Sequence, residues 1–65
     1  MLNWLLAPWH WTQRRIDLQI LWPSCRDQAP DLDHAKAAFM WHAMHDHAWL
    51  VLGEAEIIRR IGALK

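Results

Sequence analysis

Histidines and a carboxylate gather near the middle of the second half of the chain. His42, His45 and His47 fall within six residues, and Asp46 lies among them. Residues three and four apart are neighbours on a helix surface, so His42 can face both His45 and Asp46. Imidazole and carboxylate groups together are a ligand set for zinc or nickel. The spacing predicts a structural hydrogen bond between His42 and Asp46, with a metal site of His42, His45 and Asp46 as the alternative.

Other residues with reactive side chains do not form a catalytic set. Cys25 and Ser24 follow Pro23 with no histidine in local reach, whereas nucleophilic catalysis needs a positioned base and an oxyanion site. The paired acids Asp31/Asp33 and Glu54/Glu56 stand where helices are expected to begin, where the helix dipole favours negative charge. We therefore expect no enzymatic activity and no resident cofactor.

Tryptophan is the most unusual part of the composition. The chain has six tryptophans, and Trp4, Trp9, Trp11 and Trp22 fall in its first 22 residues, with Arg14 and Arg15 among them. Each indole needs a large apolar surface and a partner for its N–H group. A fold this small cannot easily surround six such rings. These four tryptophans and two arginines are the predicted contact surface.

Three settings could accommodate these indoles. Trp and Arg are enriched at the centres of protein interfaces, which fits docking onto a protein partner or a second copy of the chain. Indoles followed by arginines also suit a membrane surface with anionic lipids. The third setting is the core of the protein itself. We expect a non-enzymatic interaction protein that docks through this segment, and metal binding is the alternative function.

Composition excludes several classes of protein. The chain has 65 residues, 54% of them hydrophobic and 22% charged, with a formal net charge of zero. Disordered chains are poor in apolar residues and carry net charge. Nucleic-acid binding needs a surplus of Lys and Arg, so we expect no such partner. The single cysteine excludes an internal disulfide and a cysteine-based zinc site within one chain.

The elements that must position these residues are helices. Residues 12–22 and 54–61 have apolar residues at helical spacing, and residues 32–45 have no Gly, Pro or β-branched residue. Pro23 is expected to kink or end the first helix. The prediction is an all-α fold of two to three short helices in a hairpin or mini-bundle (13–65), preceded by a Trp-rich arm (1–12). Its predicted scaffold residues are Phe39, Ala43, Trp49, Ile57, Ile58 and Ile61.

A membrane span and an export signal are not expected. The apolar run ends at Arg14 and Arg15, well short of the roughly 20 residues of a transmembrane helix. A secretory signal has basic residues before its apolar core, and here they follow it. The sequence predicts a cytoplasmic protein, with the inner membrane surface or a virion as alternative locations.

Three segments carry a resemblance to a known group. Ile20-Leu21-Trp22-Pro23, the stretch from Ala29 to Asp33, and the alanine-rich stretch from Ala35 to Ala43 resemble small uncharacterised proteins of tailed bacteriophages and prophages. The resemblance covers residues 16–64. It implies a bacterial cytoplasmic or virion setting and a small accessory role, and it implies no activity.

Overall fold

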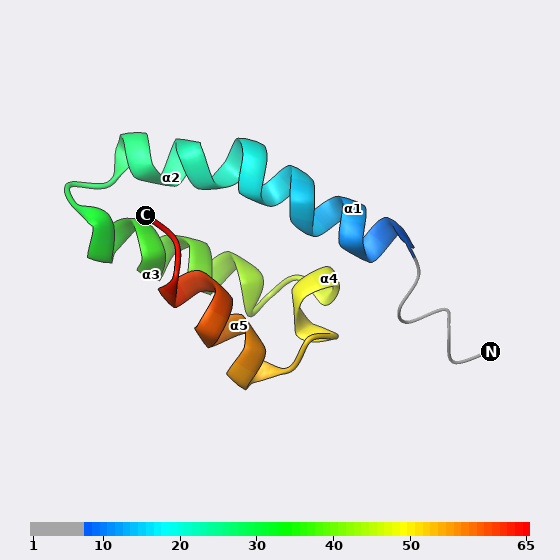
Figure 1. Cartoon of the computed structure of the whole chain (residues 1–65). Coiled ribbons are helices and arrows are strands. Elements are labelled where there is room, and N and C mark those ends of the chain that lie inside the picture. The colour runs from blue at the N-terminus through cyan, green and yellow to red at the C-terminus, as the bar shows by residue number, and fades with distance from the viewer. Residues whose placement is uncertain (1–7) are drawn as a thin grey trace.

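The described part of the computed structural model, residues 8–65, is all-α and contains no strand. Its first half is a helical rod (residues 8–28) formed by α1 (Pro8–Ile16), η2 (Asp17–Leu21) and α2 (Trp22–Gln28) without a break between them. Figure 1 shows this rod lying along one side of the molecule, opposite α3, α4 and α5. The whole measures 43 × 22 × 18 Å, so the rod sets its long axis.

The rod does not bend away or end at Pro23, contrary to the sequence prediction. The segment before the proline, η2, is a π-helix, and the N–H of Trp22 bonds to the carbonyl of Asp17, five residues back. A π-turn is wider than an α-turn, and the proline falls in the first turn of α2, where its missing N–H costs least. The wide turn therefore lets one helical path continue through a residue that normally breaks it.

A short connection then reverses the chain into α3 (Leu32–Ala43). Asp31 has extended backbone angles and its side chain accepts a hydrogen bond from the His34 N–H, as an N-cap residue does. Figure 1 shows α3 running back beneath the rod, and α2 packs against α3. This antiparallel pair is the predicted helical hairpin, with the rod as its longer arm.

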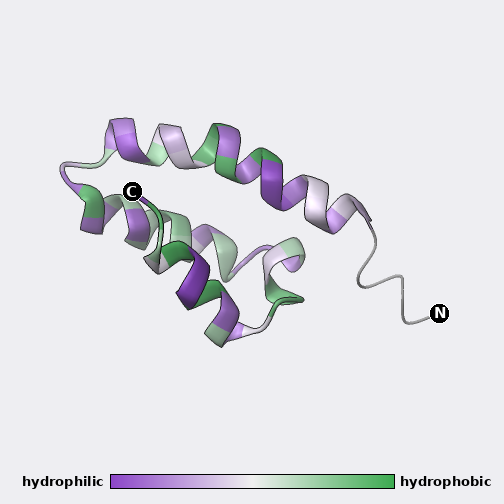
Figure 2. Ribbon diagram, viewed as in Figure 1, coloured by the Kyte–Doolittle hydropathy of each residue, from purple (hydrophilic) through white to green (hydrophobic). Residues whose placement is uncertain are grey.

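Two further helices complete the fold. The four-residue α4 (His47–Leu50) packs against α1, and α5 (Glu54–Gly62) packs against α3. Gly53 joins them with φ of 89°, the only positive φ among residues 8–65. Figure 2 shows hydrophobic and hydrophilic residues alternating in bands along α5, as expected for a helix with one buried side.

The core lies between the rod, α3 and α5. Phe39 and Trp49 are fully buried at its centre, their rings in edge contact 5.4 Å apart, and Trp22 stacks on Phe39 at 5.6 Å. The buried hydrophobic residues are Trp22, Ala35, Phe39, Ala43, Ala48, Trp49, Ile57 and Ile61. Five of the six predicted scaffold residues are therefore in the core, whereas Ile58 is 51% exposed.

The prediction of an all-α fold is confirmed, but two details of it are wrong. The described residues form more helical segments than the expected two to three. The rod continues through Pro23 and so adds α2, and α4 is a separate short helix. Residues 8–12 belong to α1, the first part of the rod, rather than to a separate arm that precedes the helical domain. The earlier part of the predicted arm, including Trp4, lies outside the described residues.

Candidate functional site

Three arginines converge on one hollow of about 250 Å³ on the surface of the molecule. We call it the arginine–indole hollow, and its lining consists of Trp11, Arg14 and Arg15 from α1, Leu18 from η2 and Arg60 from α5. It forms because α1 and α5 approach the same place from distant parts of the sequence. The hollow thus combines positive charge with an aromatic ring and an aliphatic side chain.

Arg14 is the fixed member of this group. Its Nη1 donates a 2.6 Å hydrogen bond to the backbone carbonyl of Ala48, which ties α1 to α4. Its Nε is buried and has no hydrogen-bond partner among residues 8–65. Burial, and then the like charge of Arg60, lower the pKa of Arg14 from its ordinary value. A negatively charged group in the hollow would relieve both effects.

Arg15 and Trp11 form the exposed rim of the hollow. The Arg15 guanidinium lies 5.2 Å from the centre of the Trp11 ring, within cation–π distance. Trp11 is 56% exposed and nearby Trp9 is 55% exposed. The Trp11 ring is therefore presented to solvent beside the arginines, whereas Trp9 lines another depression with His10 and His47.

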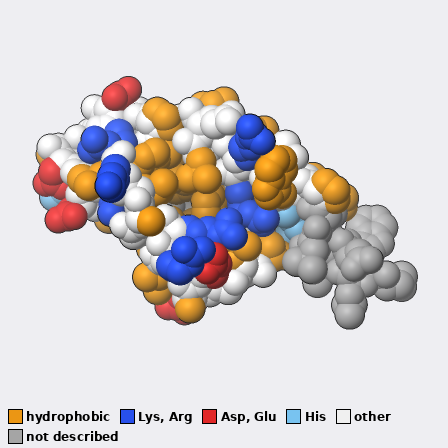
Figure 3. Space-filling view, in the orientation of Figure 1, with side chains coloured by type: hydrophobic (Ala, Val, Ile, Leu, Met, Phe, Trp, Pro, Cys, Tyr) orange, Lys and Arg blue, Asp and Glu red, His pale blue; other side chains and the backbone are white. Residues whose placement is uncertain are grey.

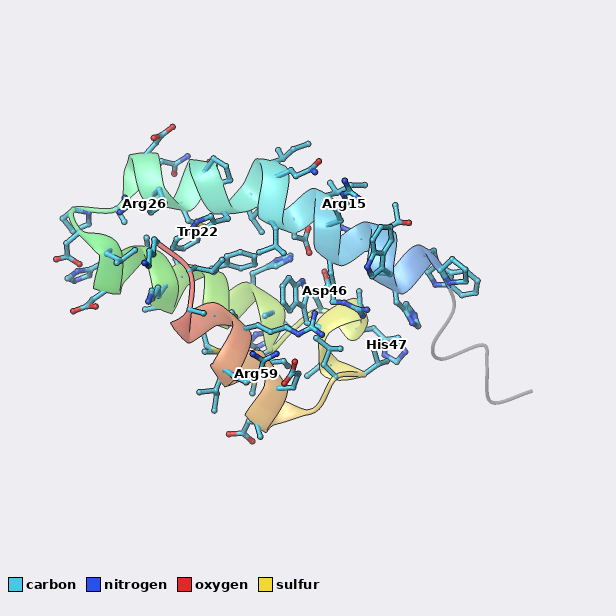
Figure 4. The ribbon with its side chains drawn as sticks, viewed as in Figure 1. Arg15, Trp22, Arg26, Asp46, His47 and Arg59 are labelled. Atoms are coloured by element: carbon cyan, nitrogen blue, oxygen red, sulfur yellow. The ribbon has the colours of Figure 1, made fainter. Side chains whose placement is uncertain are left out.

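The basic side chains extend beyond the hollow over one face of the molecule. Figure 3 shows Lys and Arg in two groups on the viewed face, with hydrophobic side chains between them and acidic side chains mostly at its edges. Arg26 and Lys65 line another surface depression, together with Trp22, Pro23 and Asp27. Figure 4 places the labelled Arg26 near the C-terminal end of the rod and Arg15 in its N-terminal half, with Arg59 on α5 below them. We call this surface the basic face.

Acidic residues balance part of this charge. Glu56 accepts hydrogen bonds from both Arg59 and Arg60, at 2.6–2.8 Å. These two arginines lower the pKa of Glu56 from 4.5 to about 2. Arg14 and Arg15 form no ion pair with a carboxylate of residues 8–65. The uncompensated positive charge of the hollow therefore resides mainly on α1.

The predicted contact residues separate into two groups. Trp9, Trp11 and Arg15 are exposed and Arg14 is half-buried. The assignment of Trp22 to a contact surface is wrong, because its side chain is 8% exposed and packs on Phe39 in the core. Sequence reasoning missed Leu18, which lies two helical turns after Trp11 on the same rod. It also missed Arg60, which only the approach of α5 to the rod brings to Trp11.

A second polar cluster joins the rod to α3 and α4. The Asp17 carboxylate is buried, and its Oδ2 lies 3.1 Å from His42 Nε2. The same His42 nitrogen lies 3.2 Å from Asp46 Oδ2. Asp17 Oδ2 also accepts from the indole N–H of Trp49 at 2.8 Å, and Oδ1 accepts from Gln13 at 3.0 Å. One imidazole is thus held between two carboxylates.

Local backbone structure positions each member of this Asp17–His42–Asp46 cluster. Asp17 opens the π-helical turn of the rod, and His42 lies in the last turn of α3. Asp46 is the N-cap of α4, and its Oδ1 accepts from the Ala48 N–H at 2.9 Å. Figure 4 shows Asp46 between the rod and α4. The three ligand atoms lie within 4.8 Å of one another.

The predicted metal site was partly wrong in its membership. His42 and Asp46 lie together as expected, but His45 does not join them, because α3 ends at Ala43. The His45 ring stacks on Trp41 at 4.3 Å, and its Nδ1 lies 2.7 Å from the Trp41 carbonyl oxygen. The third member of the cluster is the Asp17 carboxylate, 25 positions before His42. The only sequence signal for it was a single acid among the apolar residues of 16–22.

Comparisons with family models, curated proteins and solved structures find no match to this chain. No helix within residues 8–65 has the length and apolar character needed to cross a membrane.

Proposed function

We propose that this chain is a non-enzymatic interaction protein that binds an anionic phospholipid surface through its basic face. The observation that carries the proposal is the gathering of Lys and Arg on one face of a molecule with zero formal net charge. Arginine guanidinium groups recognise phosphate through paired hydrogen bonds. Indoles favour the boundary between water and apolar lipid.

The arrangement of the face favours a lipid surface over a single protein groove as the partner. Basic side chains occur at two separate places on this face rather than at one point, in the hollow and again at Arg26 and Lys65. An extended anionic surface can contact both groups at once. Each Lys or Arg brought near such a surface contributes about 1 kcal/mol.

The test is cosedimentation of the purified chain with vesicles of phosphatidylcholine alone and of phosphatidylcholine mixed with phosphatidylglycerol. We expect binding to the anionic vesicles only, and weaker binding at higher salt because salt screens exposed charges. The double variant Arg15→Gln/Arg60→Gln should bind roughly 30-fold more weakly, from about 1 kcal/mol for each lost charge.

A matched aromatic pair separates a specific face from general hydrophobicity. Trp11→Ala removes the indole of the hollow, whereas Trp41→Ala removes a 67% exposed indole that stacks on His45 of the α3–α4 connection. Only Trp11→Ala should reduce vesicle binding. Equal binding to neutral and anionic vesicles, or no binding to either, would overturn the proposal. A different outcome would establish docking onto protein instead. In that case the chain binds neither kind of vesicle but forms an oligomer, and the Trp11→Ala substitution dissociates this oligomer.

A further inference from the structure

We propose that the Asp17–His42–Asp46 cluster is a zinc site that clamps the rod to α3 and α4. This inference is independent of lipid binding, since none of the three residues lines the arginine–indole hollow. It replaces His45 of the sequence-based set with Asp17. The ligands would be one imidazole nitrogen and two carboxylate oxygens, and water would complete a tetrahedral zinc.

The spacing of the ligand atoms fits this ion. Zinc binds nitrogen and oxygen at about 2.0–2.2 Å, so neighbouring ligand atoms of a tetrahedral site lie about 3.4 Å apart. His42 Nε2 lies 3.1 Å from Asp17 Oδ2 and 3.2 Å from Asp46 Oδ2. These two distances are a few tenths of an ångström below the tetrahedral spacing, and the Asp17 and Asp46 oxygens lie within 4.8 Å of each other, so modest side-chain shifts would admit zinc. Imidazole as a ligand favours zinc over magnesium or calcium.

The surrounding hydrogen bonds orient both carboxylates in advance. Gln13 and Trp49 donate to Asp17, and the Ala48 N–H donates to the Asp46 oxygen that does not face His42. Such donors are the usual outer support of metal ligands, and they fix which oxygen points at the ion. Asp17 Oδ2 has a second lone pair, so it can keep the Trp49 hydrogen bond while it binds zinc.

The charge of the cluster also favours a divalent cation. Within residues 8–65, Asp17 and Asp46 form ion pairs with His42 and with no Lys or Arg. Two carboxylates beside a neutral imidazole carry a charge of −2, which Zn²⁺ balances. Coordination uses the Nε2 lone pair of His42, so the proton of the neutral ring would lie on Nδ1 when zinc is bound.

The test is calorimetric titration of the untagged, metal-free chain with zinc chloride. We expect one zinc per chain and a higher melting temperature in its presence. Asp17→Asn and His42→Gln should each weaken zinc binding about tenfold or more. The double variant His45→Gln/His47→Gln is the matched control, because it removes two nearby histidines that the cluster does not use, and it should leave binding unchanged.

Loss of the buried Asp17 carboxylate could unfold the chain, so Asp46→Asn provides a second test at a partly exposed position with a side chain 22% exposed. It retains the length of the side chain and an oxygen that can accept from Ala48. A circular-dichroism spectrum with the wild-type helical signal establishes that the variant folds. Absence of zinc binding below about 100 μM, or binding lost in the His45/His47 variant and retained in Asp46→Asn, would overturn the zinc site.

Discussion

Asp17 connects three helical segments through one buried carboxylate. Its oxygens accept hydrogen bonds from Gln13 of α1 and Trp49 of α4, and they face His42 of α3. A buried charge is costly unless its hydrogen bonds are satisfied, and here each oxygen has at least one partner. The Trp49 indole, itself fully buried in the core, obtains the acceptor for its N–H from the same group. Packing and polar bonding therefore depend on each other at this residue.

Asp17→Ala should lower the free energy of unfolding by about 2–4 kcal/mol, because it leaves the buried Trp49 N–H without its acceptor and removes one of the two carboxylates beside His42. Urea denaturation followed by circular dichroism measures the change. Asp27→Ala on the exposed surface of α2 is the control, and it should change stability by less than about 0.5 kcal/mol. A similar, small effect of both substitutions would show that the Asp17 bonds do not stabilise the fold.

The lowered pKa of Glu56 predicts that the free energy of unfolding decreases at acid pH. Hydrogen bonds from Arg59 and Arg60 lower the pKa of Glu56 from 4.5 to about 2. A carboxyl with a lowered pKa in the folded state stabilises fully above its unfolded value, and that contribution is lost as protons bind. The loss should fall between pH 4.5 and about 2.

Urea midpoints measured at several pH values across this interval test the contribution of Glu56. The Glu56→Gln variant cannot ionise at this position, so its midpoint should fall less between pH 4.5 and about 2 than that of the wild type. The effect should be modest, because these side chains are largely exposed to screening solvent. Parallel curves for the two proteins would contradict the assignment.

At the scale of the elements, the backbone conformation of Gly53 sets the direction in which the chain leaves α4 and enters α5. Its φ of 89° and ψ of 150° lie in a region that only glycine adopts readily. Gly53→Ala should destabilise the protein by about 1–3 kcal/mol through backbone strain alone, since no atom lies within 4 Å of the added methyl group. Thermal or urea unfolding gives the value.

Gly62→Ala is the natural control, because Gly62 is the last residue of α5, has equally open surroundings and has no positive φ. Alanine favours helix over glycine by up to about 1 kcal/mol, so this change should be neutral or slightly stabilising. Equal destabilisation by the two substitutions would rule out a special role for the Gly53 conformation.

The helices whose ends carry local signals were the ones that the sequence predicted well. Asp31 caps α3 and Gly53 precedes α5, and both boundaries could be read from residue type. The rod was not predictable in the same way, since a π-turn before Pro23 depends on how Asp17 is held by α3 and α4. Ile58 shows the limit of periodicity, because Ile57 and Ile58 are adjacent and only Ile57 faces the core.

The candidate sites followed the same division. The closeness of His42 and Asp46 was predictable from their separation of four residues on or near one helix. The positions of Asp17 and Arg60 in their sites were not predictable, because each residue reaches its site through contact between helices that are distant in sequence. The expectation that so small a fold cannot surround all of its tryptophans holds for some of them. Trp9, Trp11 and Trp41 are more than half exposed, while Trp22 and Trp49 are buried.

Lys and Arg gather in groups on the face viewed in Figure 3, although the formal net charge of the chain is zero. Asp31 and Asp33 lie at the start of α3 and Glu54 at the start of α5. Separated charge of this kind orients a protein as it approaches an anionic surface. The rod then presents Trp11 and Arg15 together, because one helix carries both.

The most direct measurement of lipid binding through the basic face is a set of ¹H–¹⁵N spectra of the labelled chain with nanodiscs. Phosphatidylglycerol nanodiscs should broaden or shift the indole N–H signal of Trp11 and the Nε–H signals of Arg15 and Arg60, while the Trp41 indole stays unchanged. Phosphatidylcholine nanodiscs should leave all four signals in place. Perturbation centred on Trp41 and α3, or an identical response to both lipids, would contradict binding through the basic face.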